Sequence, residues 1–332
     1  MSQRNHPAES ESQRAPSNQS QRCSRRSLLT ATAALSAGTM HAGAAIGAES
    51  ESASAPIDND VPSPPQIQLG NTGITMSRVG QGTGMHGGNR QSDHTRQGFE
   101  KLVALLNHAY DRGVTFFDLA DLYGSHVYFR EALRTIPRDK VTVLSKLWTR
   151  YDGPFEKIAP SHRKQAAKTT IERFCHEIAT DHLDILLLHC MTTPDWSEQL
   201  QPYMEAFDEA KKSGKLRAVG VSCHNLEALK IASRSDWVDV ILARINPHGA
   251  KMDGKVDDVV SVLTEARKNG KAIIGMKIYG EGTLADKADE CIRFAQSNGL
   301  LDTMTVGAET PEQMDQTLRL IAKYPAAPLI TP

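Results

Sequence analysis

Short apolar segments alternate with longer amphipathic segments from residue 79 almost to the end of the chain. The apolar segments have the length of buried strands, whereas the longer ones repeat apolar residues at the three- and four-residue spacing of a helix. Such alternation is typical of a parallel sheet covered by helices. The predicted strands, all short and apolar, are Val79–Gln81, Val114–Asp118, Val141–Lys146, Leu183–His189, Ala218–Ser222, Val238–Arg244, Ala272–Lys277 and Met304–Gly307.

Eight strands that alternate with helices predict an α/β protein built as a closed (β/α)8 TIM barrel, and a chain of 332 residues is long enough for one. Ahead of the first strand, Leu69–Thr75 predicts a short N-terminal β-hairpin that closes the bottom of the barrel. Glycines follow several of the predicted helices, as C-cap residues do, at Gly113, Gly214, Gly270 and Gly299. Apolar stripes mark four helices, at Leu102, Leu105, Leu106 and Tyr110, at Ile171, Phe174, Cys175 and Ile178, at Met204, Phe207 and Ala210, and at Val259, Val260, Leu263 and Ala266.

An open, doubly wound sheet is the alternative architecture, and the segment Gly82–Gly87 formally matches the GxGxxG fingerprint of such folds. That fingerprint requires a helix that opens at its last glycine, so that the helix N-terminus can hold a pyrophosphate. The residues that follow Gly87 have the composition of a loop instead. The motif therefore favours a flexible barrel loop over a dinucleotide fingerprint.

The first 65 residues differ in composition from the rest of the chain. Residues 1–48 begin with a Ser-, Gln- and Arg-rich stretch, continue through Arg25-Arg26, and end in a mildly apolar, Ala-rich run with small residues at Ala42–Ala44. This order predicts an export signal. It resembles the twin-arginine consensus, with Leu28 in place of Phe and no Lys after Leu29. A disordered basic tail is the alternative.

An export signal in residues 1–48 implies a bacterial protein carried to the periplasm or the exterior, with the twin-arginine export machinery as a partner. Residues 49–65 are rich in Ser and Pro and predict a linker, and residues 66–332 are assigned to the barrel. The Ala-rich run is interrupted by polar residues and Gly, so we expect no stable membrane span in the mature chain.

Charge and composition exclude some partners. The formal net charge is −1 and aromatic residues make up 5% of the chain, which gives no argument for a nucleic-acid partner or an anionic surface. Beyond the predicted signal the cysteines are Cys175, Cys190, Cys223 and Cys291, and no pair forms a CxxC motif. His189-Cys190 and Cys223-His224 end neighbouring strands, but alternation allows only one inward ligand from each pair. We therefore predict no metal site.

The candidate chemistry lies where predicted strands end. Asp118 ends one strand and Tyr123 follows it in the loop, while Lys146 and His189 end the next two strands. Active sites of barrels occupy this end of the strands. A buried carboxylate needs a cation, which Lys146 supplies. An ammonium group beside a phenol lowers the phenol pKa from its reference value of about 10.

The segment Phe117–Gly124 reads FDLADLYG and resembles the FDTAxxYG motif of the aldo-keto reductase family, with Leu119 in place of Thr. Asp118, Tyr123, Lys146 and His189 match the catalytic tetrad of that family in order and spacing. The resemblance implies an NAD- or NADP-dependent oxidoreductase that reduces an aldehyde or ketone, or oxidises the matching alcohol.

In this resemblance Tyr123 is the general acid, Lys146 and Asp118 tune it, and His189 polarises the substrate. Trp148 is a candidate wall of the substrate pocket, with packing at the barrel mouth as its alternative. Taken singly, each of these residues has an ordinary structural explanation. The alternative function is a nicotinamide-binding or sensory protein on the same barrel with little turnover.

The cofactor contacts depart from the pattern of the family. The resemblance places such contacts at Gly82, Thr83, Ser222, Cys223, Met276, Lys277, Gly307, Glu309 and Gln313. Among these, Cys223 replaces an Asn and Met276 replaces an aromatic residue. Leu242 occupies the place of a Gln. Two of the three usual contacts to the nicotinamide carboxamide are therefore missing.

Two charged residues bear on which nucleotide binds. Lys277 ends the seventh strand, where it could contact a pyrophosphate, although an ion pair with Glu281 or Glu309 is the alternative. Glu309, in the loop after the last strand, would repel a 2′-phosphate and could accept hydrogen bonds from a free ribose. The sequence therefore favours NAD over NADP.

Overall fold

The computed structural model of the protein describes residues 60–153 and 157–331. The predicted export signal, residues 1–48, and most of the predicted linker, residues 49–65, lie outside the described residues. The boundaries of these segments and the export of the protein to the periplasm or exterior therefore stay predictions. None of the helices in the described ranges has the length and apolar character that crossing a membrane requires.

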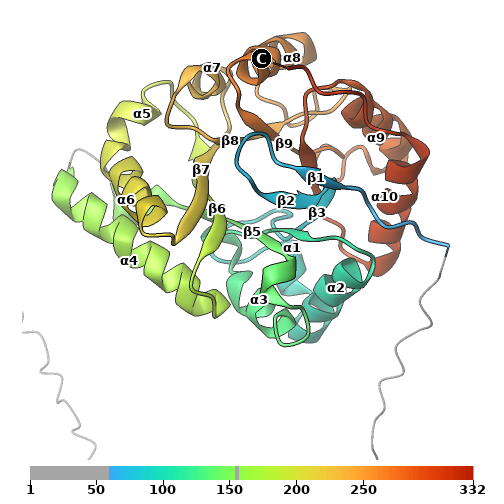
Figure 1. Ribbon diagram of the computed structural model, residues 1–332, viewed down its shortest axis with the longest axis horizontal. Helices are drawn as coiled ribbons and strands as arrows, with labels where there is room; N and C mark the ends of the chain where they lie inside the picture. Colours follow the sequence, from blue (N-terminus) through green and yellow to red (C-terminus); the bar gives the residue numbers. More distant parts are fainter. Residues whose placement is uncertain (1–59, 154–156, 332) are drawn as a thin grey trace, which may run out of the picture. The chain divides into compact units, whose positions relative to one another are not determined.

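Eight parallel strands close into a barrel in the order β10-β3-β4-β5-β6-β7-β8-β9, which confirms the predicted (β/α)8 architecture (Figure 1). The open-sheet alternative is wrong. The strands are β3 (Val79–Gly82), β4 (Phe116–Asp118), β5 (Thr142–Leu147), β6 (Leu183–Met191), β7 (Leu216–Cys223), β8 (Val240–Arg244), β9 (Ala272–Met276) and β10 (Thr303–Val306). Each overlaps its predicted segment, with ends that differ by a few residues.

Helices surround the barrel, and the four predicted apolar stripes fall on α2, α4, α6 and α8. The longer helices are α2 (Phe99–Asp111), α3 (His126–Ala132), α4 (Pro160–Ile178), α6 (Gln201–Lys212), α7 (Leu226–Arg234), α8 (Val256–Lys268), α9 (Ala288–Ser297) and α10 (Pro311–Lys323). Shorter elements are α1 (Asp93–Arg96), α5 (Trp196–Gln199) and the 3₁₀ turns η1 (Asp121–Tyr123), η2 (Arg138–Lys140), η3 (Thr149–Asp152) and η5 (Ala285–Lys287). The predicted C-cap glycines all have positive φ, at Gly113, Gly214, Gly270 and Gly299.

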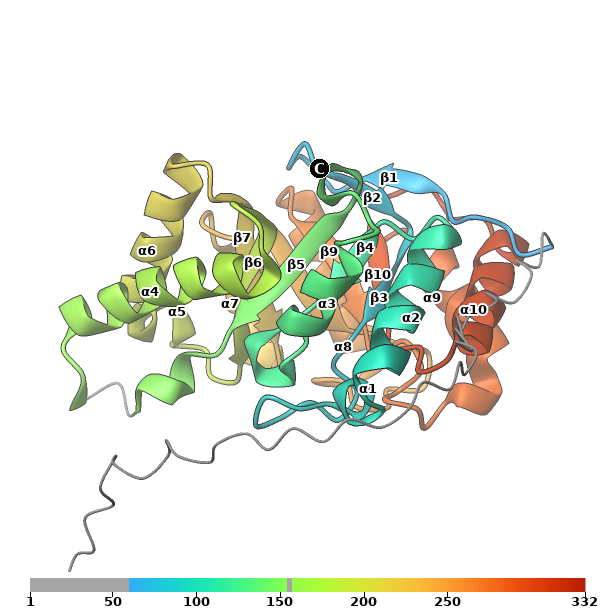
Figure 2. The same cartoon turned by 90° about the horizontal axis from the view of Figure 1, so that it is seen from below.

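A two-stranded antiparallel hairpin precedes the barrel, formed by β1 (Gln66–Gln68) and β2 (Thr75–Ser77). It lies across one end of the barrel, opposite α1 and the loop that follows β3 (Figure 2). Leu69, Ile74 and Met76 of this hairpin are fully buried, and they form one apolar cluster with side chains of the barrel interior such as Phe116 and Leu144. The predicted hairpin is confirmed, and it leaves only the opposite end of the barrel open for a site.

Candidate active site

Four side chains from three successive strands and one loop meet at the open end of the barrel. Asp118 ends β4, Lys146 lies on β5 and His189 lies on β6, while Tyr123 ends the turn η1 that follows β4. Parallel pairing of β4 with β5 and of β5 with β6 places their carboxyl ends side by side. The structure therefore brings together the four residues predicted as the tetrad.

The contacts among these four side chains are direct. The Lys146 Nζ forms an ion pair with Asp118 Oδ1 and donates a hydrogen bond of 3.0 Å to the Leu119 carbonyl. It also lies 4.8 Å from the centroid of the Tyr123 ring. The phenolic Oη of Tyr123 is 3.4 Å from Nε2 of His189. An oxygen atom placed between the phenol and the imidazole would reach both.

Protonation of the site is governed by burial. Burial, with Asp118 adding to it, raises the pKa of Tyr123 well above its usual value. Burial, followed by the charge of Lys146, lowers the pKa of His189 well below its usual value. At neutral pH the phenol is therefore protonated and the imidazole is neutral, and both can donate a hydrogen bond.

The sequence predicts a phenol pKa lowered by Lys146, whereas the pKa of Tyr123 is raised, because the ammonium does not outweigh burial and Asp118. The reason is that Asp118 lies against Lys146 and offsets its positive charge, while the loss of water around Tyr123 penalises the phenolate. Burial likewise lowers the pKa of Lys146, and the charge and hydrogen bond of Asp118 oppose that effect. The ion pair thus holds Lys146 in place more than it acidifies the phenol.

The loop after β3 packs flat against the ring of Tyr123. A Cβ atom added at Gly84 or at Gly87 would clash with ring atoms of Tyr123. These two glycines belong to the GxGxxG match, and α1 begins only at Asp93. Their absent side chains make room for a tyrosine, a role that no local pattern in the sequence indicates because the packing partner lies on another loop.

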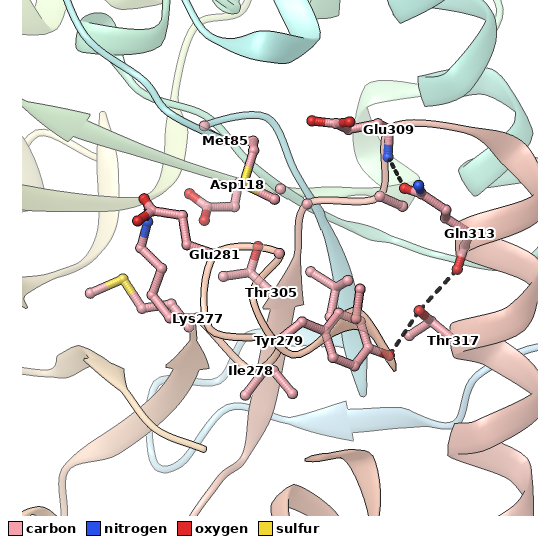
Figure 3. Close-up of a pocket in the computed structure, with 18 of the residues that line it drawn as sticks. Met85, Asp118, Lys277, Ile278, Tyr279, Glu281, Thr305, Glu309, Gln313 and Thr317 are labelled. Carbon is pink, nitrogen blue, oxygen red and sulfur yellow. Dashed lines mark hydrogen bonds and ion pairs between the residues drawn. The ribbon is translucent and has the colours of Figure 1, made fainter. Parts of the chain in front are cut away.

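A cavity of about 310 Å³ extends from the tetrad between the loops that follow β3, β9 and β10 (Figure 3). Asp118 and Tyr123 line one part of it, and Gln313 and Thr317 of α10 line another. Six of the predicted cofactor contacts line the same cavity: Gly82, Met276, Lys277, Gly307, Glu309 and Gln313. Other lining residues went unpredicted because no recognisable motif marks them, among them Met85, Tyr279 and Glu281 in loops and Thr305 on β10.

Three predicted cofactor contacts do not line the cavity. Thr83 is buried and donates a hydrogen bond of 2.9 Å to the Asp118 carbonyl. Ser222 Oγ accepts a hydrogen bond of 2.8 Å from the backbone N–H of Cys190. Cys223 is fully buried in the apolar layer between strands and helices. Thr83 and Ser222 thus brace the backbone of the mouth, and Cys223 belongs to the core.

Lys277 pairs with Glu281, one of the two alternatives that the sequence leaves open. The Lys277 Nζ is 2.5 Å from Glu281 Oε1, and both residues have positive φ, 57° and 60°. Among the described residues that line the cavity, Lys277 is the only Lys or Arg, and the acids are Asp118, Glu281 and Glu309. A ligand phosphate would therefore meet a lysine that already has an acidic partner.

The loop after β10 is organised by the start of α10. The backbone N–H of Glu309 donates a hydrogen bond of 2.7 Å to Gln313 Oε1, and Thr310 caps the helix by accepting from Gln313 N. Thr305, at the end of β10, has a buried hydroxyl without a hydrogen-bond partner. An orphaned polar atom on a cavity wall is the kind of group that a bound ligand satisfies.

Trp148 stands at the rim of the tetrad. Its ring meets the ring of His189 edge-on with centroids 5.6 Å apart, and the guanidinium of Arg150 lies 5.2 Å from the Trp148 ring. Trp148 is half-buried, so it can serve as a wall next to the imidazole.

Within the described ranges, no three residues among His, Cys, Asp and Glu are grouped as metal ligands.

Comparisons with known proteins identify the family to which the chain is similar. The profile of the Aldo/keto reductase family matches residues 78–324. The NADH-specific methylglyoxal reductase of Escherichia coli (strain K12) is 26% identical over 196 residues, which cover 54% of this chain and 58% of that protein. The 6-dehydroglucose reductase of Novosphingobium aromaticivorans is 27% identical over 266 residues, or 74% of this chain and 82% of that one.

A solved structure shares the fold. The holo form of an aldo-keto reductase from Bacillus halodurans superimposes with a TM-score of 0.61 at 18% sequence identity, covering 80% of this chain and 92% of that one. At that level of identity the likeness concerns the barrel alone. The chain spans less than two thirds of the length of the methylglyoxal reductase.

The packing of Gly84 on Tyr123 gives a testable prediction. Gly84→Ala forces the Tyr123 ring or the loop to shift, and overpacking of this kind lowers the free energy of unfolding by about 1–3 kcal/mol. Gly88→Ala is the matched control, because a Cβ there meets no atom within 4 Å. Denaturant unfolding of both variants checks it, and equal stabilities would contradict the close contact.

Proposed function

The chain belongs to the aldo/keto reductase family, and on this premise we propose that it is a nicotinamide-dependent oxidoreductase that reduces an aldehyde or ketone. The observation that carries the proposal is the meeting of Tyr123 Oη and His189 Nε2 at 3.4 Å beside the buried ion pair of Asp118 and Lys146. These two donors converge on the place where a carbonyl oxygen would sit.

Tyr123 and His189 act on the oxygen of the substrate. The neutral imidazole donates a hydrogen bond from Nε2 to the carbonyl oxygen, which draws electron density away from the carbonyl carbon. The protonated phenol donates a second hydrogen bond and gives up its proton as the oxygen becomes an alkoxide. The ammonium of Lys146, 4.8 Å from the ring centroid, stabilises the phenolate that remains. Asp118 holds that ammonium in position.

A nicotinamide nucleotide fits the cavity beside these donors. Apolar side chains such as Met85, Met276 and Ile278 can pack on its rings, while the unpartnered hydroxyl of Thr305 offers a hydrogen bond. When bound, the nicotinamide supplies the hydride that reaches the carbonyl carbon. The residues that would hold it are Gly82, Met276, Lys277, Gly307, Glu309 and Gln313.

NADH is the proposed nucleotide rather than NADPH. The part of the cavity wall that the structure describes has one lysine, which is paired with Glu281, and Glu309 lies in the loop after β10 with its backbone N–H bonded to Gln313. A 2′-phosphate would meet a carboxylate there, whereas a ribose diol can donate hydrogen bonds to it. The NADH-specific methylglyoxal reductase is among the relatives. Methylglyoxal and oxidised sugars are therefore the first carbonyls to test.

We also propose that residues 1–48 direct the protein out of the cytoplasm by the twin-arginine route. The support is the Arg25-Arg26 pair followed by the Ala-rich run. This route carries folded proteins, so the nucleotide could enter the barrel before export.

Tyr123→Phe tests the acid. Removing the phenolic proton should lower kcat by about 100- to 10,000-fold, the usual contribution of a general acid, while the Kd of NADH stays nearly unchanged. The control is Tyr128→Phe, whose hydroxyl donates to the Thr95 carbonyl in the packing between helices. Steady-state kinetics with NADH and methylglyoxal measure both. A Tyr123→Phe enzyme as fast as wild type would refute the role of Tyr123, and a wild type that binds NADH without turnover would favour the sensory alternative.

Glu309→Arg tests the choice of nucleotide. An arginine in place of the carboxylate should shift the ratio of kcat/KM values towards NADPH by about tenfold or more, since a charge-assisted contact is worth about 1.5–3 kcal/mol. Glu312→Arg, on the exposed side of the same loop and helix start, is the matched control. If both variants keep the nucleotide ratio of wild type, Glu309 does not face the ribose.

Replacing Arg25 and Arg26 together by Lys tests export. The charge of the segment is kept, but the twin-arginine pair is lost, so we expect the full-length protein to remain in the cytoplasmic fraction. Cell fractionation with immunoblotting measures this in a bacterial host that has the twin-arginine system. Unchanged export of the double variant would exclude that route, and a wild-type chain that stays in the cytoplasm would exclude export altogether.

A further inference from the structure

A buried charge network lies outside the barrel, beside the loop that carries Tyr123, and the chemistry described above makes no use of it. Its centre is Asp121, the first residue of η1 and the second residue before Tyr123, with a side chain that is 1% exposed. The turn η1 has no side-chain cap of its own. Contacts from other elements must therefore fix its position.

Two arginines hold the carboxylate of Asp121. Arg90, from the loop after β3, places Nη1 2.8 Å from Oδ1. Arg173, on α4, places Nη1 3.0 Å from Oδ1 and Nη2 2.7 Å from Oδ2. The second contact is a two-pronged guanidinium–carboxylate pair, which fixes orientation as well as distance.

The same two arginines share a second acid, Glu177 of α4. Its Oε1 is 3.0 Å from Arg90 Nη2 and 2.8 Å from Arg173 Nη1. Two positive and two negative side chains thus form one closed group. A compensated group of this kind tolerates burial, whereas loss of one member leaves a buried charge without its partner.

His126 continues the network to the strand that carries Lys146. Its Nδ1 is 2.7 Å from Glu177 Oε2, and its Nε2 is 2.8 Å from Ser145 Oγ. Burial lowers the pKa of His126, so the neutral ring donates from Nδ1 and accepts from the serine hydroxyl. Ser145 precedes Lys146 on β5 and, by alternation, faces the helices while Lys146 faces the barrel mouth.

The elements that carry the network also pack against one another. A Cβ atom added at Gly124, the residue after Tyr123, would clash with the carbonyl oxygen of Arg90. α3 and α4, which carry His126 and Arg173, pack against each other on the outside of the barrel (Figures 1 and 2). The network therefore connects the loop after β3, which packs against the Tyr123 ring, with η1, α3, α4 and β5.

We propose that Asp121, held by Arg90 and Arg173, is a positioning residue that fixes the phenol of Tyr123 relative to Lys146 and His189. The inference rests on the proposed reduction of a carbonyl. The network then acts on the rate through Tyr123 and not only through the stability of the fold. A displacement of about 1 Å at a reacting group can cost a hundredfold in rate.

Arg173→Met tests this inference, because Arg173 is one-third exposed and Arg90 still pairs with both acids in its absence, so the barrel should remain folded. We expect kcat for methylglyoxal with NADH to fall roughly 10- to 100-fold, with the Kd of NADH unchanged. Arg173→Lys keeps the charge and loses the two-pronged contact, so its kcat should lie between those of wild type and Arg173→Met. Arg234→Met is the matched control, since Arg234 pairs with Glu265 at an exposed position outside the network, and it should keep wild-type kcat.

The same substitution in a Tyr123→Phe background separates positioning from stability. If the network acts through the phenol, Arg173→Met changes the residual single-turnover rate of Tyr123→Phe by less than about twofold, a non-additive result. Equal losses in both backgrounds, or a wild-type kcat in Arg173→Met, would overturn the inference. Arg90→Met, with a half-exposed side chain, repeats the test if Arg173→Met proves unstable. A wild-type chain that turns over no carbonyl contradicts the proposed function instead.

Discussion

The buried ion pair between Lys146 and Asp118 is the interaction on which the site depends. The two side chains are 1% and 8% exposed, and burying either charge alone costs several kcal/mol. Each charge therefore requires the other, and the Leu119 carbonyl takes a further hydrogen of the ammonium. This requirement fixes the ends of β4 and β5 relative to each other. Burial is the first cause of the pKa shifts of Tyr123 and His189, and the charge of Lys146 adds to the shift of His189.

The barrel supplies the rest of the geometry by bringing loops from distant parts of the sequence to one end. Tyr123 is contacted by the loop after β3 through Gly84 and Gly87, and by His189 from β6. Glycine carries an entropic cost in the unfolded chain, yet any side chain at either position would displace the ring. The site thus combines one buried ion pair with a close fit between the Tyr123 ring and two glycines that have no side chains.

Much of this could be predicted from the sequence because it depends on periodicity and on the order of residues at strand ends. The strands, the hairpin and the meeting of Asp118 with Lys146 follow from those two properties. The burial of Cys223 in the core was not predicted, although alternation along β7 already puts Cys223 and Ser222 on opposite faces. The contacts of Gly84 and Asp121 depend on partners far apart in the chain, which no local pattern reveals. The pKa of Tyr123 depends on the balance between burial and charge, and only the structure gives that balance.

The charge of the cavity restricts how a nucleotide could be held. Lys277 and Glu281 are each about one-fifth exposed, so their ion pair is only partly shielded from water. A pyrophosphate of the proposed nucleotide would compete with Glu281 for Lys277, and Glu281 would keep Lys251, at 3.6 Å, as a second partner. A 2′-phosphate near Glu309 would find no second cation, because Lys277 is the only Lys or Arg among the described residues of the cavity wall. This distribution of charge on the cavity wall is what supports the proposal of NADH over NADPH.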